Sequence, residues 1–332
     1  MQAHAETIGT RADGVRADRL SVLTWHVHGN YLYYLTQAPH DFYIVTKEGN
    51  PPGYAGAGGA LPWGANVHEI PYERVREAQF DCVIYQQRSH YEEDRFTILS
   101  EAQRALPQVY IEHDPPQQHP TDTLHWVQDA QALLVHVTAF NKLMWDAGVT
   151  PTTVIEHGVV IPPGVRHNGE LARGITVINH LKQRGRRLGA DIFAHARQHV
   201  PIDLVGMDAQ SAGGIGEISN PELAAFCAPY RFFFNPIRYT SLGLAIVEAM
   251  MIGMPIIGMA TTELTSVIEN NRNGYVSNDI NELIEVMQRL IREPELAREW
   301  GAAARATALK RFTISRFAND WDRTLRAAYP RR

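Results

Sequence analysis

Residues 232–276 read FFFNPIRYTSLGLAIVEAMMIGMPIIGMATTELTSVIENNRNGYV, and this stretch decides the fold. Apolar runs at 231–234 and 255–259 predict two buried strands, and the segment after each run predicts a helix. Strands that alternate with helices are typical of a parallel sheet, because parallel neighbours need a crossover connection. The stretch therefore predicts an α/β domain.

Glu248 is the only charged side chain in residues 242–257 of this stretch. An ionised carboxylate on a buried helix costs several kcal/mol unless another group pairs with it. Glu248 therefore lies either on a wet edge of the helix or at a place where it binds a ligand. The apolar surroundings favour the second interpretation.

Hydroxyl side chains precede both predicted helices. Thr240 or Ser241 is expected to cap the first helix, and Thr261 or Thr262 the second. Both helices then begin at the carboxyl ends of their strands. Open α/β sheets bind ligands at these ends, and helix N-termini attract phosphate.

The order of these features resembles the donor-nucleotide site of the retaining GT-B glycosyltransferases of family four. The residues that carry the resemblance are Ser241, Leu242, Gly243, Val247, Glu248, Ala249, Met250, Gly253, Pro255, Asn273 and Gly274. The family has two glutamates here, and the carboxylate of the second holds the donor ribose hydroxyls. Glu248 matches the second glutamate, whereas the first falls at Thr240, so the chain departs from the pattern there.

The resemblance implies two Rossmann-like doubly wound domains that face a central cleft. It also implies that Ser241, Leu242, Gly243, Thr261 and Thr262 contact the donor. Transfer of a hexose from a nucleotide diphosphate sugar, with retention, is expected. No metal or other cofactor is expected, since positioning and electrostatic stabilisation of the departing diphosphate suffice.

Two candidates replace the glutamate that is missing at Thr240. The Thr240 hydroxyl can hydrogen-bond a sugar hydroxyl, although more weakly than a carboxylate. Glu263 can supply the lost charge from the neighbouring turn, or it can cap its own helix. We therefore treat Thr240 and Glu263 as catalytic candidates.

A basic run at 180–187, HLKQRGRR, follows a predicted strand. Positive charge at a helix start is unfavourable against the helix dipole unless an anion compensates. The resemblance implies that two basic residues here hold the donor pyrophosphate. His180 stands where the family has an arginine, so the pair comes from Lys182, Arg184 and Arg187, of which Arg184 and Arg187 are favoured.

Four further residues gain a role from the resemblance. Gly29 and Asn30 follow the first strand in a loop that faces the donor phosphates, and glycine lets the backbone approach a ligand closely. Gly206 ends a strand whose loop faces the base. His113 resembles the histidine of the N-terminal domain that reaches toward the donor sugar, so it is a catalytic candidate.

The length of 332 residues suits two α/β domains. We expect a mobile arm (1–18), an acceptor-side domain (19–160), a linker (161–169), a nucleotide-sugar-binding domain (170–313) and a helix that crosses back to the first domain (314–332). In the first domain, residues 91–105 and 121–128 are predicted helices. Residues 48–64, rich in Gly, Pro and Ala, are either an acceptor-side lid or a floppy insertion.

A net charge of −5 and a pI near 6.3 argue against nucleic acid as a partner. No apolar run approaches the ~18 residues of a membrane span. Cys82 and Cys227, without a secretory segment, are expected to be buried thiols in the reducing cytoplasm. Peripheral attachment at the inner face of a membrane stays open. The fifteen histidines show no metal-ligand spacing.

The expected function is transfer of a hexose to a glycan or lipid-linked acceptor, in cell-surface polysaccharide or glycoconjugate synthesis. Two alternatives stay open. A non-catalytic nucleotide-sugar-binding subunit is favoured by the missing glutamate at Thr240. A nucleotide-sugar epimerase of the same fold would use an acid-base pair, for which His113 with Glu112 is the candidate.

Overall fold

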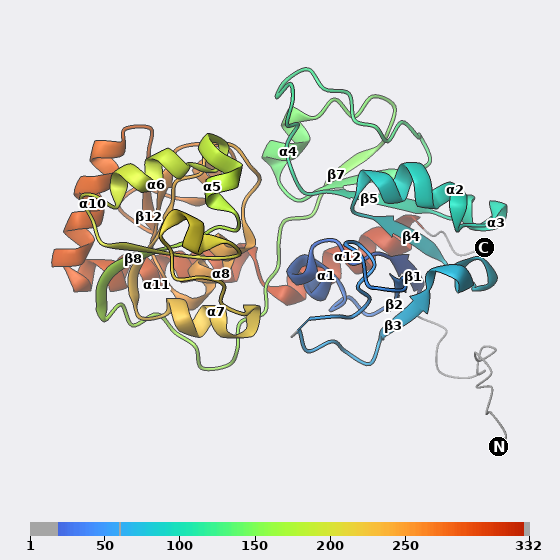
Figure 1. Ribbon diagram of the computed structural model, residues 1–332, viewed down its shortest axis with the longest axis horizontal. Helices are drawn as coiled ribbons and strands as arrows, with labels where there is room; N and C mark the ends of the chain where they lie inside the picture. The colour runs from blue at the N-terminus through green and yellow to red at the C-terminus, as the bar shows by residue number, and fades with distance from the viewer. Residues whose placement is uncertain (1–18, 60, 329–332) are drawn as a thin grey trace.

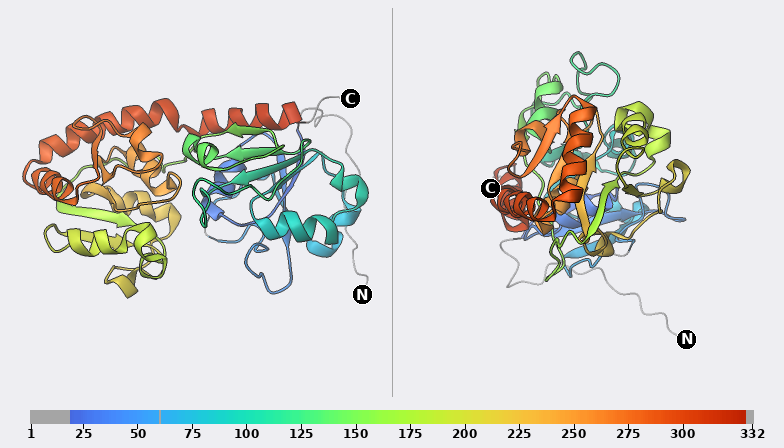
Figure 2. Two further views of the ribbon diagram at one scale, coloured as in Figure 1. Left: turned by 90° about the horizontal axis from the view of Figure 1, so that it is seen from above. Right: turned by 90° about the vertical axis from the view of Figure 1, so that its left-hand side faces the viewer.

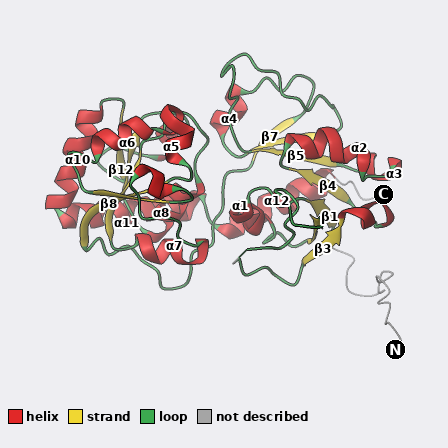
Figure 3. Ribbon diagram, viewed as in Figure 1, coloured by secondary structure: helices red, strands yellow, loops and turns green. Residues whose placement is uncertain are grey.

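The computed structural model describes residues 19–59 and 61–328, so the arm expected at 1–18 lies outside the described residues. The chain forms two α/β domains, each built on a parallel sheet with helices against it (Figure 1, Figure 3). The N-terminal sheet has seven strands in the order β3-β2-β1-β4-β5-β6-β7. The C-terminal sheet has five, in the order β12-β11-β10-β8-β9.

The central strands β4 and β5 of the N-terminal domain are buried at every position, whereas the outer strands β3 and β7 are mostly half-buried or exposed. The strands are β1 (Ser21–Thr24), β2 (Asp41–Thr46), β3 (Val67–Pro71), β4 (Cys82–Tyr85), β5 (Gln108–Glu112), β6 (Leu133–His136) and β7 (Thr152–Val154). The α-helices are α1 (Gly29–Leu35), α2 (Arg95–Thr97), α3 (Glu101–Arg104) and α4 (Ala139–Met144).

The C-terminal domain has longer helices. Its strands are β8 (Leu171–Val177), β9 (Ile202–Val205), β10 (Tyr230–Asn235), β11 (Ile256–Met259) and β12 (Gly274–Ser277). Its helices are α5 (Leu181–Arg184), α6 (Ala190–Ala196), α7 (Asn220–Cys227), α8 (Leu244–Ile252), α9 (Leu264–Val267), α10 (Ile280–Arg292) and α11 (Pro294–Arg311). The last helix, α12, spans Ile314–Ala328.

Both sheets are doubly wound, and the strand order sets where each can bind a ligand. The order reverses between β1 and β4 in the first sheet and between β8 and β10 in the second. Ligands bind outside the carboxyl ends of the strands at such switch points. The loops after β1 and β8 line one cavity between the domains, so the two switch points face each other.

Helix α12 returns from the C-terminal domain and packs against the N-terminal one (Figure 2). Its side chains Phe317, Trp321 and Leu325 are completely buried. Arg316 donates hydrogen bonds to the backbone carbonyls of Glu156 and His157, in the segment that leaves the first domain. The predicted GT-B architecture with a crossover helix is confirmed. The domain limits themselves stay a prediction.

The prediction of a helix over 121–128 is wrong. Backbone amides of this segment donate to acceptors outside any helix. The amide of His125 donates to the carbonyl oxygen of Asp146 at 2.8 Å. The amide of Val127 donates to His125 Nδ1 at 3.0 Å. The segment therefore runs as an irregular loop over the carboxyl end of β5.

The helix predicted over 91–105 is broken into pieces. A π-helical turn at His90–Asp94 leads into α2, and a capping box then starts α3. In that box, the Ser100 hydroxyl accepts from the Gln103 amide and the Gln103 side chain accepts from the Ser100 amide. Such a box fixes a new helix start, which explains the interruption.

Among the described residues, none of the helices has the length and apolar character that crossing a bilayer requires. Cys82 and Cys227 are both buried free thiols, as predicted, and burial raises the pKa of each. Residues 48–59 and 61–64 form no helix and no strand, also as predicted. Tyr54 fastens this loop, since its hydroxyl donates to Asp94 Oδ2 at 2.7 Å.

Candidate functional site

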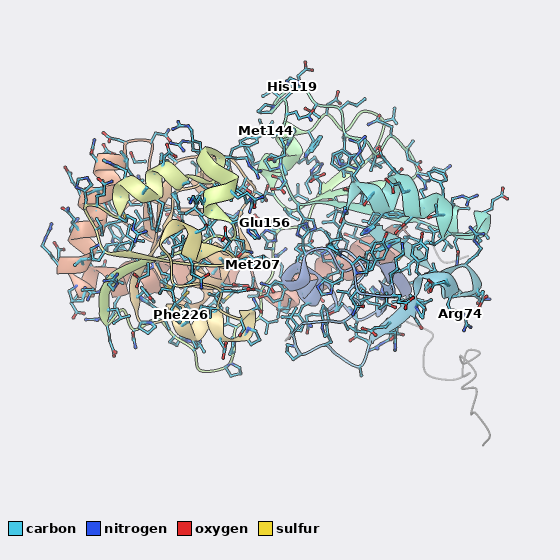
Figure 4. The ribbon with its side chains drawn as sticks, in the orientation of Figure 1. Arg74, His119, Met144, Glu156, Met207 and Phe226 are labelled. Carbon is cyan, nitrogen blue, oxygen red and sulfur yellow. The ribbon has the colours of Figure 1, made fainter. Side chains whose placement is uncertain are left out.

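A cavity of about 510 Å³ lies between the two domains, and both contribute to its walls. Residues 27–31, after β1, form the wall on the N-terminal side. Met207, labelled in Figure 4, lies on the opposite wall. The polar residues that line the cavity are His28, Asn30, Asn179, Arg184, Glu217, Asn220, Thr240 and Glu248.

The N-terminus of α8 opens into this cavity. Gly243 occupies the N-cap position, and no side chain caps the helix. The predicted cap by Thr240 or Ser241 is therefore wrong. Gly243, Leu244 and Ala245 line the cavity instead, so the positive end of the helix dipole faces it. A helix start of this kind attracts an anion.

Glu248 is buried on α8 and lines the cavity, as the sequence led us to expect. Its Oε1 accepts a hydrogen bond of 2.7 Å from the Tyr34 hydroxyl, which belongs to α1 of the other domain. The Asn220 side chain also hydrogen-bonds Glu248. Burial raises the pKa of Glu248, and the bonds from Tyr34 and Asn220 oppose that rise.

Tyr34→Phe is expected to weaken nucleotide binding more at pH 6 than at pH 8. The Tyr34 hydroxyl favours the ionised carboxylate, so its removal raises the pKa of Glu248 further. A larger protonated fraction at pH 6 then leaves fewer carboxylates to accept from ribose hydroxyls. Calorimetric titration with a nucleoside diphosphate at both pH values measures this. The control is Tyr33→Phe, next to it on α1, and equal losses at both pH values would contradict the prediction.

Arg184 ends the short helix α5 and lines the cavity. Burial lowers the pKa of Arg184, Arg187 lowers it further, and Asp114 opposes both effects. Arg184 thus lies at the cavity with a second cation nearby, and a bound anion would relieve their repulsion. Arg187 does not line the cavity. Its guanidinium donates instead to the side chain of Gln117, in a loop of the N-terminal domain.

His113 follows β5 and lies behind the cavity wall, outside the lining. Its Nε2 lies 3.1 Å from Gln86 Oε1. Its ring centroid lies 4.2 Å from that of His28, which does line the cavity. Burial, and then His28 and His157, hold the pKa of His113 well below its usual range, so His113 is neutral at pH 7. His28 is thus the histidine that reaches the cavity.

The residues predicted in the two glycine-containing loops lie where a ligand can approach the backbone. Gly29, Asn30 and Gly206 all line the cavity. At Gly206, φ is 135°, and an added Cβ would lie 2.6 Å from the carbonyl oxygen of Ile178. Only glycine fits that combination of dihedral angle and space.

The remaining donor-site candidates divide into two groups. Thr240 lines the cavity, and its hydroxyl donates to Asp114 Oδ1 at 3.3 Å across the domain boundary. Ser241 and Leu242 are buried beside it, and the carbonyl oxygen of Leu242 lies 2.8 Å from His157 Nε2. Neither of the two lines the cavity.

Thr261 and Thr262 also lie outside the cavity lining. The Thr261 hydroxyl donates to the carbonyl oxygen of Ile237 at 3.0 Å. Thr262 has a φ of 52°, a left-handed turn after which α9 begins only at Leu264. The predicted helix start at Thr261 or Thr262 is therefore wrong.

Glu263 makes contacts that fit neither of the roles predicted for it. It precedes α9 without capping that helix through its side chain, and it does not line the cavity. Its Oε2 instead accepts from the Phe140 amide at 2.8 Å, in the first turn of α4. Arg311 lies 3.9 Å from Oε1. Glu263 therefore joins the two domains, and a catalytic role for it stays a prediction.

Within residues 19–59 and 61–328, no three His, Cys, Asp or Glu side chains converge in a way that could hold a metal ion. The independence from metals that the resemblance implies stays a prediction. The polar groups at the cavity include the Glu248 carboxylate, the Arg184 guanidinium and the open N-terminus of α8. This set matches a nucleoside diphosphate, whose ribose offers hydroxyls and whose phosphates carry negative charge.

The chain resembles known proteins most clearly in its C-terminal half. Residues 184–323 match a family described as glycosyl transferase-like. A trehalose synthase from Pyrococcus horikoshii is 35% identical over 74 residues, which are 22% of this chain and 18% of that protein. The chain thus spans about a fifth of the length of the curated relatives it matches.

Solved structures match over nearly the whole chain. A sucrose-phosphate synthase from Thermosynechococcus elongatus superposes with a TM-score of 0.66 at 15% identity, covering 93% of this chain and 99% of that one. Anabaena HepE in complex with UDP and glucose superposes with a TM-score of 0.63 at 13% identity, covering 93% and 100%. The protein has the GT-B glycosyltransferase fold, and it resembles family four, as its sequence predicted.

Proposed function

We propose that the protein is a retaining hexosyltransferase that uses a nucleotide diphosphate sugar as donor. The observation that carries this proposal is the interdomain cavity, which combines Glu248, Arg184 and the open N-terminus of α8. The carboxylate accepts from the ribose hydroxyls. The guanidinium and the helix dipole stabilise the diphosphate as its negative charge grows during departure.

The resemblance to family four supports retention at the anomeric carbon, and the structural similarity to HepE in complex with UDP and glucose supports a nucleotide-sugar donor. We propose a glycan or lipid-linked acceptor, with residues 48–64 as a lid on the acceptor side. The activity would then serve cell-surface polysaccharide or glycoconjugate synthesis. Its place would be the cytoplasm, including peripheral attachment at the inner face of the membrane.

A screen of UDP, GDP, ADP and TDP by thermal unfolding tests the donor site. One of the four is expected to raise the melting temperature by several degrees, because a ligand at a hundred times its Kd stabilises by about 2.7 kcal/mol. The matching nucleoside is the control, and it should shift the melting temperature less because it lacks the diphosphate. Absence of any shift would contradict the proposal.

Incubation with sugar nucleotides separates transfer from the alternatives. A transferase releases the nucleoside diphosphate, by transfer or by slow hydrolysis. An epimerase would produce a second sugar nucleotide, and a non-catalytic subunit would bind without turnover. The interdomain position of Thr240, hydrogen-bonded to a carboxylate, is the observation that favours the transferase over the binding subunit.

A further inference from the structure

Asp114 places a carboxylate of the N-terminal domain against Thr240. Thr240 lines the cavity, whereas Asp114 lies just outside the lining. The Thr240 hydroxyl donates to Asp114 Oδ1 at 3.3 Å, although the two residues belong to different domains. We propose that the Asp114 carboxylate accepts hydrogen bonds from hydroxyls of the donor sugar. This inference rests on the proposed function.

The surroundings of Asp114 place its charge at the cavity. Burial lowers the pKa of His28, and the charge of Asp114 opposes this effect. Asp114 acts in the same way on Arg184. His28, Arg184 and Thr240 all line the cavity, from two domains, and Asp114 interacts with each of them. A sugar attached to a diphosphate at Arg184 would therefore lie beside this carboxylate.

Two hydrogen bonds and the two prolines that follow hold the backbone of Asp114 in place. Its amide donates to Glu112 Oε1 at 3.0 Å. Its carbonyl oxygen accepts from Trp145 Nε1 at 2.8 Å. The pyrrolidine rings of Pro115 and Pro116 follow and restrict the chain further. A carboxylate on a fixed backbone keeps its position when the sugar arrives, which is what selective binding of hydroxyls requires.

Thr240 alone would bind the hydroxyls of the sugar less strongly than Asp114 does. A neutral hydroxyl forms weaker hydrogen bonds to a sugar than a carboxylate does. In this structure its proton is also already engaged by Asp114. The side chains at 114 and 240 therefore act as one unit, in which the charge comes from the N-terminal domain. A carboxylate at either of these two positions should accept hydrogen bonds from the sugar hydroxyls.

The experiment compares binding of the sugar nucleotide with binding of its nucleoside diphosphate in Asp114→Asn. The probes are the nucleoside diphosphate that gives the largest thermal shift and its glucose conjugate. The added affinity that the sugar confers is expected to fall about tenfold, because a charge-assisted hydrogen bond is lost. The affinity for the nucleoside diphosphate should stay equal or rise, since a negative charge near the phosphates is removed.

A second substitution makes the test independent of folding effects. Thr240→Glu in the Asp114→Asn background is expected to restore the sugar-dependent affinity, whereas Thr240→Glu alone brings two carboxylates together and should lower it. Asp122→Asn, an exposed acid in the same loop, is the control. Melting temperatures of all variants identify any that fail to fold.

Two outcomes would overturn the inference. One is an unchanged ratio of the two affinities in Asp114→Asn. The other is an equal loss for both ligands that Thr240→Glu does not restore. Failure of the proposed function would look different. The unsubstituted protein would then bind no nucleoside diphosphate, and the inference would lose its basis as well.

Discussion

Arg184→Ala is expected to lower the turnover number about a hundredfold, as loss of one preorganised donor to a developing negative charge does in other enzymes. The guanidinium lines the cavity, where burial and Arg187 already lower its pKa. Burial and Arg187 disfavour the charged form of this guanidinium. Its attraction to the leaving diphosphate therefore becomes stronger as the diphosphate becomes more negative. Turnover is measured by release of the nucleoside diphosphate from its sugar conjugate.

Lys182→Ala is the matched control, because Lys182 carries the same charge on the same helix but is exposed and lies outside the cavity. It should leave turnover unchanged. In Arg184→Ala, affinity should fall for the nucleoside diphosphate and not for the nucleoside. Equal losses for both ligands would show that the basic run supports the fold.

Glu248→Gln is expected to weaken nucleoside diphosphate binding at least about tenfold, since each hydrogen bond to a charged group contributes roughly 1.5 to 3 kcal/mol. The amide oxygen of glutamine can still accept from the Tyr34 hydroxyl, so the contact between the domains is kept. The variant loses the negative charge to which the ribose hydroxyls would donate hydrogen bonds. Isothermal calorimetry measures the affinity.

Glu285→Gln, on the exposed face of α10, changes the net charge equally and should have no effect on that affinity. The melting temperature shows whether either variant perturbs the fold. If Glu248→Gln bound the nucleotide as tightly as the unsubstituted protein, the ribose role would be wrong. The carboxylate would then serve only to join α8 to α1.

The fold was predictable because its strands are short apolar runs between helices. Strand β3 escaped prediction because His68 and Glu69 interrupt the apolar pattern of an outer strand. The helix expected over 121–128 failed for a different reason. The amides of this segment are bonded to groups that no local pattern reveals, such as the carbonyl oxygen of Asp146.

The site was predictable where the resemblance supplied a position, as at Gly29 and Arg184, and where one residue carried the signal alone. Glu248 could be found because a single charge on an apolar helix is costly unless another group or a ligand pairs with it. Its partner Tyr34 lies 214 residues away in the sequence, and the partner of Thr240 lies 126 residues away. Such pairs arise from how the two domains face each other. The contact of Glu263 was missed for the same reason, since its partner Phe140 also belongs to the other domain.

The crossover helix has a consequence for synthesis of the chain on the ribosome. Phe317 contacts Tyr31 edge to face, with ring centroids 5.6 Å apart, so the first domain is completed by residues that are made after the second domain. At about 5 to 20 residues per second, roughly 160 residues separate β7 from this contact by some 8 to 30 s. During that interval the nascent first domain exposes the apolar face that α12 later covers, and exposed apolar surface of this kind is what chaperones bind.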